Sequence, residues 1–445
     1  MSATVDALPD DVHVRLRPPP GVREIAERLE AAGHETWCVG GAVRDAVLRH
    51  PSLDWDLATA ATPDVVRRLF RRTVPKGIEF GTVGVFDRHG VMHEVTTFRR
   101  DVRTDGRHAE VEFGASLDDD LARRDFTINA IAFSPARGVL HDPFDGLGDL
   151  ARRVVRAVGD PSTRLREDRL RALRAIRFAG RFGFAIEPAT WAAIVESAPH
   201  LGRLSPERVR EELEKTMRQV ARPSAALEQW RASGALAALV PALAGQPREA
   251  LAAADCLPMP GLARRPQRLW NRMAAPWLGL ERGAVEQGMR ALRCSNQETR
   301  WVADVADRWQ RLGPELRAAL GPGAPAVPDV QLRRWAAAAG RTLAPAVLRV
   351  AAARFAAERT LGLPAPEGAR VRSVYRRLVR AAFRDPVALG DLAVSGTDLQ
   401  RAAGVPAGPR VGQILQQLLE LVVEEPAANV RERLLAEARR LAEAS

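Results

Sequence analysis

The chain has 445 residues, enough for about two to four domains with hydrophobic cores of their own. Its 66 Lys and Arg outnumber its 55 Asp and Glu, and the formal net charge of +11 favours a polyanionic partner, either nucleic acid or an acidic membrane surface. The three cysteines are isolated and no apolar run has the length of a membrane span, so we expect a cytoplasmic protein with neither a disulfide framework nor a zinc knuckle.

The N-terminal part of the chain predicts a strand, a glycine turn and a helix in succession. A first helix is expected over Val22–Ala32. Trp37–Val39 is short, apolar and β-prone, Gly40-Gly41 ends it, and Ala42–Leu48 has helical character. Such an arrangement points free backbone N–H groups and the positive end of a helix dipole at a phosphate.

Two aspartates follow the turn on what we expect to be the next strand, Leu53–Ala58. Residues two apart in a strand share a face, so Asp54 and Asp56 point one way while Trp55 and Leu57 point the other. Two carboxylates beside a phosphate cradle can anchor two Mg²⁺ ions, which stabilise the attacking and leaving oxygens of a phosphoryl displacement. Each fragment alone is also compatible with an ordinary turn or a solvated strand, but their succession points to nucleotidyl transfer.

A third carboxylate lies on one of three further strands. Thr62-Pro63 starts a helix, and strands are expected over Thr73–Pro75, Thr82–Phe86 and Val91–Phe98. On the last of these, Glu94 shares a face with apolar neighbours, which is unusual if that face is buried. Either Glu94 joins the two aspartates at the site, or it is an ordinary solvated residue.

Two charged stretches come next. Arg99–Phe113 is polar without periodicity, which predicts a loop, and a loop beside a catalytic strand can act as a lid. In Leu121–Phe133, Arg124 and Asp125 precede an apolar run, and Asn129 falls on the same side as Asp125 if the segment is helical. The alternative is a charged helix start without further function.

From Ala151 onward the chain predicts helices and no strand, because Leu, Ala and Arg recur at helical spacing. Arg166–Phe182 is expected to be one amphipathic helix with Glu167, Asp168 and Arg171 on a common face. Such pairs are routinely surface salt bridges that contribute about 0.3–0.5 kcal/mol, which is the alternative to a binding site here.

Taken together, these strings resemble a known family. GGAVRD with DWDLAT, and then EVTTFR, RRDFTINA and EDRLR, are similar to motifs of the class II nucleotidyltransferases, which are the tRNA CCA-adding enzymes and the bacterial poly(A) polymerases. The resemblance covers most of residues 35–240 and also 388–436. It implies a polymerase-β-like α/β (α+β) head with a small mixed sheet, followed by an all-α neck, body and tail. The expected parts are an extended lead-in (1–20), a catalytic head (21–150), a neck with the base-recognition helix (151–222), a body (223–328) and a tRNA-binding tail (329–445).

The resemblance also implies an activity, which is template-independent addition of CMP and AMP to the 3′ end of tRNA from CTP and ATP. Asp54 and Asp56 would hold Mg²⁺, with Glu94 assisting as the third catalytic acid. The remaining implied contacts are with the nucleotide: Gly40, Gly41, Arg44 and Arg124 with the triphosphate, Asp125 and Asn129 with the ribose, and Glu167, Asp168 and Arg171 with the base.

The chemistry of the bases favours the last assignment. Cytosine and adenine both show an amino donor beside a ring-nitrogen acceptor, whereas uracil and guanine invert that pattern. A carboxylate with a guanidinium would therefore admit CTP and ATP and leave buried polar groups unpaired with the other two.

Three other functions stay open. A poly(A) polymerase would share the chemistry, although residues 73–86 lack the Gly-Arg-Arg-Phe segment common in those enzymes. The second is a half-enzyme that adds only C or only A. Arg99–Phe113 matches the family loop that governs the switch from C to A, but it lacks the tyrosine common in that loop. The third is an inert RNA-binding homologue, which retention of all three carboxylates disfavours.

Overall fold

The computed structural model describes residues 16–50, 54–104, 109–260 and 266–443 of the chain. Two compact units are present: the first contains residues up to Glu212 together with Gln229–Leu239, and the second contains Leu213–Glu228 together with Val240 and all that follows. The finer division into head, neck, body and tail stays a prediction. None of the described helices combines the length and the apolarity that a membrane span requires.

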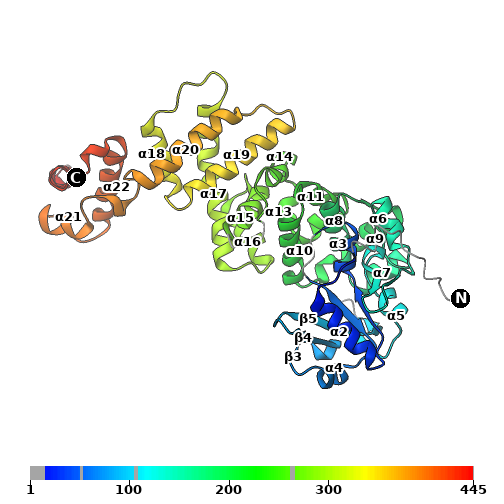
Figure 1. Ribbon diagram of the computed structural model, residues 1–445. Helices are drawn as coiled ribbons and strands as arrows, with labels where there is room; N and C mark the ends of the chain where they lie inside the picture. The colour runs from blue at the N-terminus through cyan, green and yellow to red at the C-terminus, as the bar shows by residue number, and fades with distance from the viewer. Residues whose placement is uncertain (1–15, 51–53, 105–108, 261–265, 444–445) are drawn as a thin grey trace. The chain divides into compact units, whose positions relative to one another are not determined.

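The first unit is built around a mixed sheet of seven strands (Figure 1). In order across the sheet these are β3 (Thr73–Pro75), β4 (Thr82–Phe86), β5 (Met92–Thr97), β2 (Asp56–Thr59), β1 (Thr36–Val39), β8 (Ala132–Ser134) and β9 (Val139–His141). Only β2 and β5 run parallel, and all other neighbours are antiparallel. The predicted mixed sheet is therefore confirmed, with the two parallel strands at its centre.

Helices cover this sheet because their apolar faces match it. Helix α2 (Pro20–Ala31) buries Val22, Ile25 and Leu29, spaced three and four residues apart, and packs against β1 and β2. Helix α4 (Pro63–Leu69) packs against β4 and β5, with proline at its first position as predicted. The other helical segments of the unit are α3 (Gly41–Val47), α5 (Leu117–Ala122), α6 (Gly146–Arg152), α7 (Pro161–Glu167), α8 (Leu170–Phe182), α9 (Pro188–Ser197), α12 (Ala235–Leu239) and the single turns η1 (Ile78–Phe80), η2 (Thr127–Asn129) and η3 (Ala198–Arg203).

The described residues of the second unit form helices and connecting loops and no strand. The chain passes between the two units at three points: within α10 (Pro206–Gln219), within α11 (Pro223–Ala232) and between Leu239 and Val240. One core gathers apolar residues of α17 to α20, and another gathers those of α21 to α23. Its α-helices are α13 (Pro241–Ala244), α14 (Arg248–Ala252), α15 (Pro266–Ala274), α16 (Arg282–Ala291), α17 (Asn296–Leu320), α18 (Asp329–Ala339), α19 (Ala344–Thr360), α20 (Gly368–Arg384), α21 (Gly396–Ala402), α22 (Pro409–Glu424) and α23 (Arg431–Glu443).

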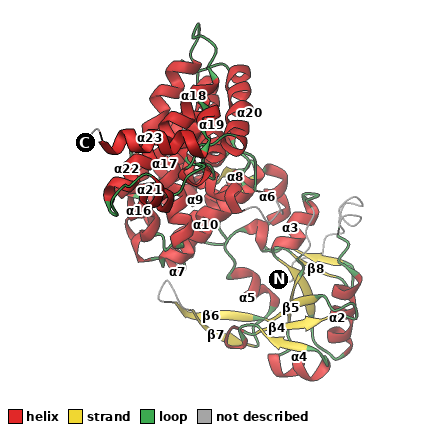
Figure 2. Ribbon diagram, turned by 90° about the vertical axis from the view of Figure 1, so that its left-hand side faces the viewer, coloured by secondary structure: helices red, strands yellow, loops and turns green. Residues whose placement is uncertain are grey.

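The prediction of a loop over Arg99–Phe113 was wrong, because this stretch contains two antiparallel strands, β6 (Arg99–Thr104) and β7 (Ala109–Phe113). Figure 2 shows this ribbon beside the main sheet. Arg100 pairs across it with Glu112 at 2.8 Å between nitrogen and oxygen. The five residues of β7 do alternate apolar and acidic side chains, but Arg99–Thr104 does not, so the stretch as a whole shows no periodicity.

Two further predictions need correction. The single helix Arg166–Phe182 is broken into α7 and α8 at Asp168, whose backbone is extended (φ −148°, ψ 104°). The stretch beyond Ala151 does contain strands, since Val154–Val155 (β10) pairs in parallel with Ala185–Ile186 (β11). Two residues are too few to produce a periodic pattern, and both strands are held by the helices around them.

Candidate active site

Strand register places two of the three predicted carboxylates side by side. Leu57 of β2 pairs with Val95 of the parallel strand β5. Asp56 and Glu94 each precede a member of this pair by one residue, so they lie on neighbouring strands and on the same face. The second strand is shorter than predicted, since β2 begins at Asp56 and Leu53 lies outside the described residues.

The expected alternation of the Asp-x-Asp segment is confirmed. Trp55 and Leu57 are buried while Asp54 and Asp56 are on the solvent side. Asp56 keeps some exposure, but the protein around its carboxyl displaces much of the water there, and this desolvation together with the negative charges of Asp54 and Glu94 raises the pKa of Asp56 to about 6. The three carboxylates therefore repel one another, and a bound divalent cation would remove this repulsion. Carboxylate oxygens are also the ligands that Mg²⁺ prefers.

Lys76 partly neutralises this region. It follows β3 directly, and its ammonium contacts the Glu94 carboxylate, with both side chains partly exposed. Among the described residues no three Asp, Glu, His or Cys side chains converge closely enough to form a ready cation cage. The Glu94 carboxylate is held toward Lys76.

A glycine turn and an arginine form the second half of the site. Gly40 precedes α3 with φ 75° and ψ −129°, and a Cβ there would lie 2.8 Å from the guanidinium of Arg124. Only glycine therefore allows this approach. Arg124 is anchored through Nη2 to Asp120 at 3.0 Å, but its Nε is buried without a hydrogen-bond partner. A phosphate oxygen would satisfy that donor.

Arg44, predicted to meet the triphosphate, is buried instead of lining an open surface. Its Nε donates to Asp45 at 2.8 Å, and its Nη1 contacts the Asn129 side-chain oxygen. The guanidinium lies over the rings of Phe178 and Phe182, 4.9 and 4.8 Å from their centres. Arg44 is therefore placed to fix Asn129 and the turn before α3.

Asp125 and Asn129 lie together, although by a tight turn and not by the helix considered above. The Asn129 amide donates to Asp125 Oδ1 at 2.8 Å. The other oxygen, Oδ2, accepts from Nε and Nη2 of Arg174 on α8, at 2.8 and 2.7 Å. Burial alone would raise the pKa of Asp125, but Arg174 and Asn129 outweigh it and hold the pKa at about 2. Asp125 is therefore a charged acceptor that links the sheet region to α8.

The three residues predicted to read the base lie around the break between α7 and α8. Arg171 donates to Glu167 at 2.8 Å and to the backbone oxygen of Arg123 at 3.0 Å, so it joins α8 to the segment that carries Arg124. Asp168 does not share their helical face, because its backbone is extended there. Its carboxylate accepts from the N–H of Leu170 at 3.1 Å and from Arg208 at 2.7 Å.

Sequence reasoning missed several residues that organise this site. Asp120 is 1% exposed and binds both Arg123 and Arg124, and its spacing of three and four residues from them was a readable signal. Lys76 could have been noticed because only it and Lys215 are lysines among 66 cationic residues. Arg174 and Arg208 gave no such signal, because their partners are 49 and 40 residues away.

Family profiles match three parts of the chain. Residues 36–156 match the profile described as "Poly A polymerase head domain". Residues 183–246 match "Probable RNA and SrmB- binding site of polymerase A". Residues 384–438 match a profile for tRNA nucleotidyltransferase domain 2. The sequence motifs and these profiles therefore agree on the kind of head, and the polymerase-β-like fold with a helical remainder is confirmed.

Individual relatives are similar over almost their whole length. The CCA-adding enzyme of Limosilactobacillus fermentum is 36% identical over 420 residues, which cover 93% of this chain and 94% of that protein. The crystal structure of the Bacillus stearothermophilus CCA-adding enzyme in complex with CTP superposes with a TM-score of 0.73 at 34% identity, covering 95% of this chain and 98% of that one. The Thermotoga maritima CCA-adding enzyme complexed with tRNA shares the fold at 20% identity, with a TM-score of 0.64 and 98% of each chain covered.

Proposed function

The chain belongs to the family of CCA-adding enzymes, the tRNA nucleotidyltransferases, and on that premise we propose that it adds C, C and A to the 3′ end of tRNA from CTP and ATP. The observation that carries the proposal is the register that sets Glu94 beside Asp56, within the field of Asp54 and next to the Gly40–Arg124 turn. This combination brings metal-binding carboxylates and an unsatisfied phosphate donor to one place.

The carboxylates are proposed to hold divalent metal, with Mg²⁺ as the ion. Asp54 and Asp56 would be its ligands and Glu94 would assist once it leaves Lys76. When bound, the metal would stabilise charge on the attacking 3′-oxygen and on the leaving pyrophosphate. The bond that forms joins the RNA 3′-oxygen to the α-phosphorus, and the bond that breaks releases pyrophosphate.

The triphosphate would lie against the turn before α3. Backbone N–H groups at Gly40 and Gly41 and the unsatisfied Nε of Arg124 are the donors proposed for it. Because Arg44 is buried and contacts Asn129, its proposed part is to hold this turn and the ribose-binding amide in place. Asp125, kept ionised by Arg174, would orient Asn129 toward the ribose.

Base selection is proposed to use the break between α7 and α8. Arg171 would donate to the ring nitrogen and a carboxylate of Glu167 or Asp168 would accept from the amino group. Two donors outside α7, the N–H of Leu170 and the guanidinium of Arg208, hold the Asp168 carboxylate in place. The β6–β7 ribbon, which contacts α5, is the element proposed to change the preference from C to A as the 3′ end grows.

The place of action is proposed to be the cytoplasm. All three cysteines are free thiols, and Cys256 is exposed. An exposed unpaired thiol suits a reducing compartment.

The product of a single reaction tests the proposal. Purified protein with Mg²⁺, CTP and ATP should extend a tRNA that ends at its discriminator base by three nucleotides and then stop. A run of many adenosines would make it a poly(A) polymerase, and a stop after two cytidines would make it a C-adding half-enzyme. No extension by a folded protein that binds tRNA would favour an inert homologue.

A matched pair of variants assigns the chemistry to the site. Asp56→Asn should abolish extension, whereas Asp64→Asn should not, because Asp64 lies on α4 with its side chain 87% exposed. Equal activity in both variants would refute the assignment of the carboxylates.

A further inference from the structure

A hollow on the first unit lies apart from the residues assigned above to the metal and the nucleotide. It lies where the start of α2, the segment after α4 and the turn between β4 and β5 meet, and its volume is about 380 Å³. Helices α2 and α4 lie next to each other there (Figure 1). Small-molecule sites have volumes of about 300–1,000 Å³, so the hollow has room for one small ligand.

Four arginines line the hollow and outnumber its two acidic side chains. Arg28, Arg71 and Arg72 are exposed, and among the described residues none of the three forms an ion pair. Arg88 pairs only loosely with Glu24, at 3.8 Å between nitrogen and oxygen. The hollow therefore carries a net positive charge.

The second acidic residue, Asp87, holds the turn between β4 and β5. Its Oδ1 accepts from the backbone N–H groups of His89 and Val91, both at 2.9 Å, and its Oδ2 is 3.3 Å from the ring of His93. A Cβ on Gly21 would lie 2.2 Å from Asp87 Oδ2, so glycine is what allows α2 to begin against this turn. Asp87 is thus part of the wall and forms no ion pair with the described arginines of the hollow.

Aromatic rings hold two of the arginines in place. The guanidinium of Arg28 lies over Phe70, 5.1 Å from the ring centre, and that of Arg72 lies over Phe86 at 5.0 Å. Stacking fixes the plane of each guanidinium and leaves the N–H groups at its edge available. A planar guanidinium presents parallel N–H donors to a phosphate. Arg28 and Arg72 are therefore pre-organised for a phosphorylated ligand.

An apolar floor accompanies this charge. Ile25 and Phe70 both line the hollow and are 3% and 8% exposed. An inorganic phosphate or pyrophosphate would engage the arginines but leave the apolar floor and much of the space unfilled. A nucleotide has phosphates for the arginines and a ring system for the rest, and bases stack on aromatic side chains and on guanidinium planes. The combination of groups fits a nucleotide better than a simple anion.

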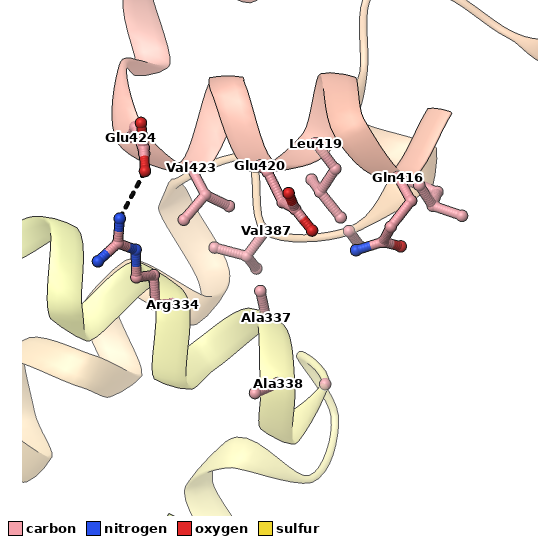
Figure 3. A pocket seen from close by; sticks show the side chains of 12 residues that line it. Arg334, Ala337, Ala338, Val387, Gln416, Leu419, Glu420, Val423 and Glu424 are labelled. Carbon is pink, nitrogen blue, oxygen red and sulfur yellow. Dashed lines mark hydrogen bonds and ion pairs between the residues drawn. The ribbon is translucent and has the colours of Figure 1, made fainter. Parts of the chain in front are cut away.

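A larger hollow in the second unit has the opposite charge. Figure 3 shows Leu419 and Val423 lining a space between α18 and α22, with a volume of about 610 Å³. Glu420 and Glu424 stand at this space, and Glu424 pairs with Arg334. Acidic groups repel phosphates, so this larger space does not suit a nucleotide. Charge, and not size alone, therefore distinguishes the hollow at the start of α2.

We propose that the hollow at the start of α2 is a second nucleotide site, separate from the catalytic one. Arg28, Arg71 and Arg72 bind the phosphates of a nucleoside polyphosphate, and its ring system covers the apolar floor. The site goes beyond the proposed function, because nucleotide addition uses the carboxylates around Asp56 and the turn before α3. Phosphate is the shared chemistry of nucleotides and of the pyrophosphate that the proposed reaction releases, so the test separates these two sources.

The test measures binding of radiolabelled GTP by equilibrium dialysis in EDTA. The base selection proposed above excludes GTP from the catalytic site, so GTP reports on the hollow, and the full-length protein should bind one GTP per chain. Arg28→Ala with Arg72→Ala should weaken this binding about tenfold or more for each arginine, because charge-assisted hydrogen bonds to phosphate are lost. Arg23→Ala with Arg68→Ala removes the same charge from exposed positions on α2 and α4 outside the hollow and should leave binding unchanged.

A single charge reversal guards against misfolding of the double variant. Arg71→Glu changes an exposed side chain and should also weaken GTP binding, whereas Arg68→Glu should not. Arg124→Ala should leave GTP binding intact, because Arg124 belongs to the catalytic turn.

Four results would overturn the proposal. They are absence of GTP binding, wild-type binding in the hollow variants, an equal loss in the control variants, and loss of binding in Arg124→Ala. Inorganic pyrophosphate should displace GTP only at concentrations about tenfold higher or more, since it lacks the ring. Displacement at equal concentrations would show a simple anion site and refute the assignment to nucleotides.

Discussion

Replacing Asp125 by Asn tests the network that joins the sheet region to α8. Asn keeps the shape of Asp125 and one oxygen, which can still accept from Asn129 and from the N–H of Phe126 at the Oδ1 position. Its NH₂ group then faces the two Arg174 donors that Oδ2 now accepts. The change therefore removes one charge and leaves Arg174 without its partner.

The expected cost follows from the pKa of Asp125. Arg174 and Asn129 hold this pKa at about 2, against an ordinary value of 3.8. A difference of roughly two units corresponds to roughly 2 to 3 kcal/mol of unfolding free energy at neutral pH. Breaking a buried ion pair costs about 3–5 kcal/mol, and water reduces this here because the Arg174 side chain is 33% exposed. Both arguments predict that Asp125→Asn lowers the free energy of unfolding by about 2–3 kcal/mol at neutral pH.

Urea unfolding at several pH values is the measurement. The folded pKa of Asp125 is depressed, so its stabilisation is complete above the unfolded pKa near 4 and is lost as the pH falls toward 2. The difference between wild type and Asp125→Asn should thus be largest at pH 7 and about half as large at pH 3. CTP affinity should fall as well, because Asn129 loses its charged acceptor.

A double-mutant cycle tests whether the loss of the ion pair with Arg174 causes the destabilisation by Asp125→Asn. Arg174→Met removes the stranded charge, so the double variant should be more stable than the sum of the single changes predicts. Additive effects, or a cost below about 0.5 kcal/mol for Asp125→Asn at pH 7, would refute the network.

Two other substitutions address the reacting groups. Lys76→Met should free Glu94 and tighten Mn²⁺ binding without nucleotide by a factor of about 2 to 5, as measured by electron paramagnetic resonance; weaker binding would mean instead that Lys76 orients Glu94 for the metal. Arg171→Ala should reduce the preference of kcat/KM for CTP over UTP by about 5- to 150-fold, by analogy with base-edge contacts on DNA. If Arg171→Ala changed only the melting temperature, its pairing with Glu167 would be merely structural.

Local pattern was enough to locate the reacting groups along the chain. Trp55 and Leu57 are apolar and therefore occupy the buried face, so alternation along the strand directs Asp54 and Asp56 to the opposite, solvent-facing side. The glycine turn before α3 followed from Gly40-Gly41 after an apolar strand. These conclusions depend on neighbouring residues only, whose relations are set by strand and helix geometry.

The β6–β7 ribbon and the break at Asp168 could not be read in this way. Only its second strand, Ala109–Phe113, alternates apolar and polar residues, and five such residues at the end of a charged stretch are a weak signal. At Asp168 the helical spacing of the sequence continues, but the side chain binds Arg208 from another helix and the N–H that begins α8. Contacts from outside the segment therefore overrode its local preference.

Long-range pairing decided how the groups meet. The parallel register of β2 and β5 brings Glu94 to Asp56 across 38 positions of the chain, and α8 brings Arg174 to Asp125 across 49. It also buries Arg44, which the sequence alone left available to a phosphate. A sequence states which side chains can bind metal, phosphate or base. Their partners and their access to solvent arise only when distant segments pack, because charge interactions depend on distance and burial.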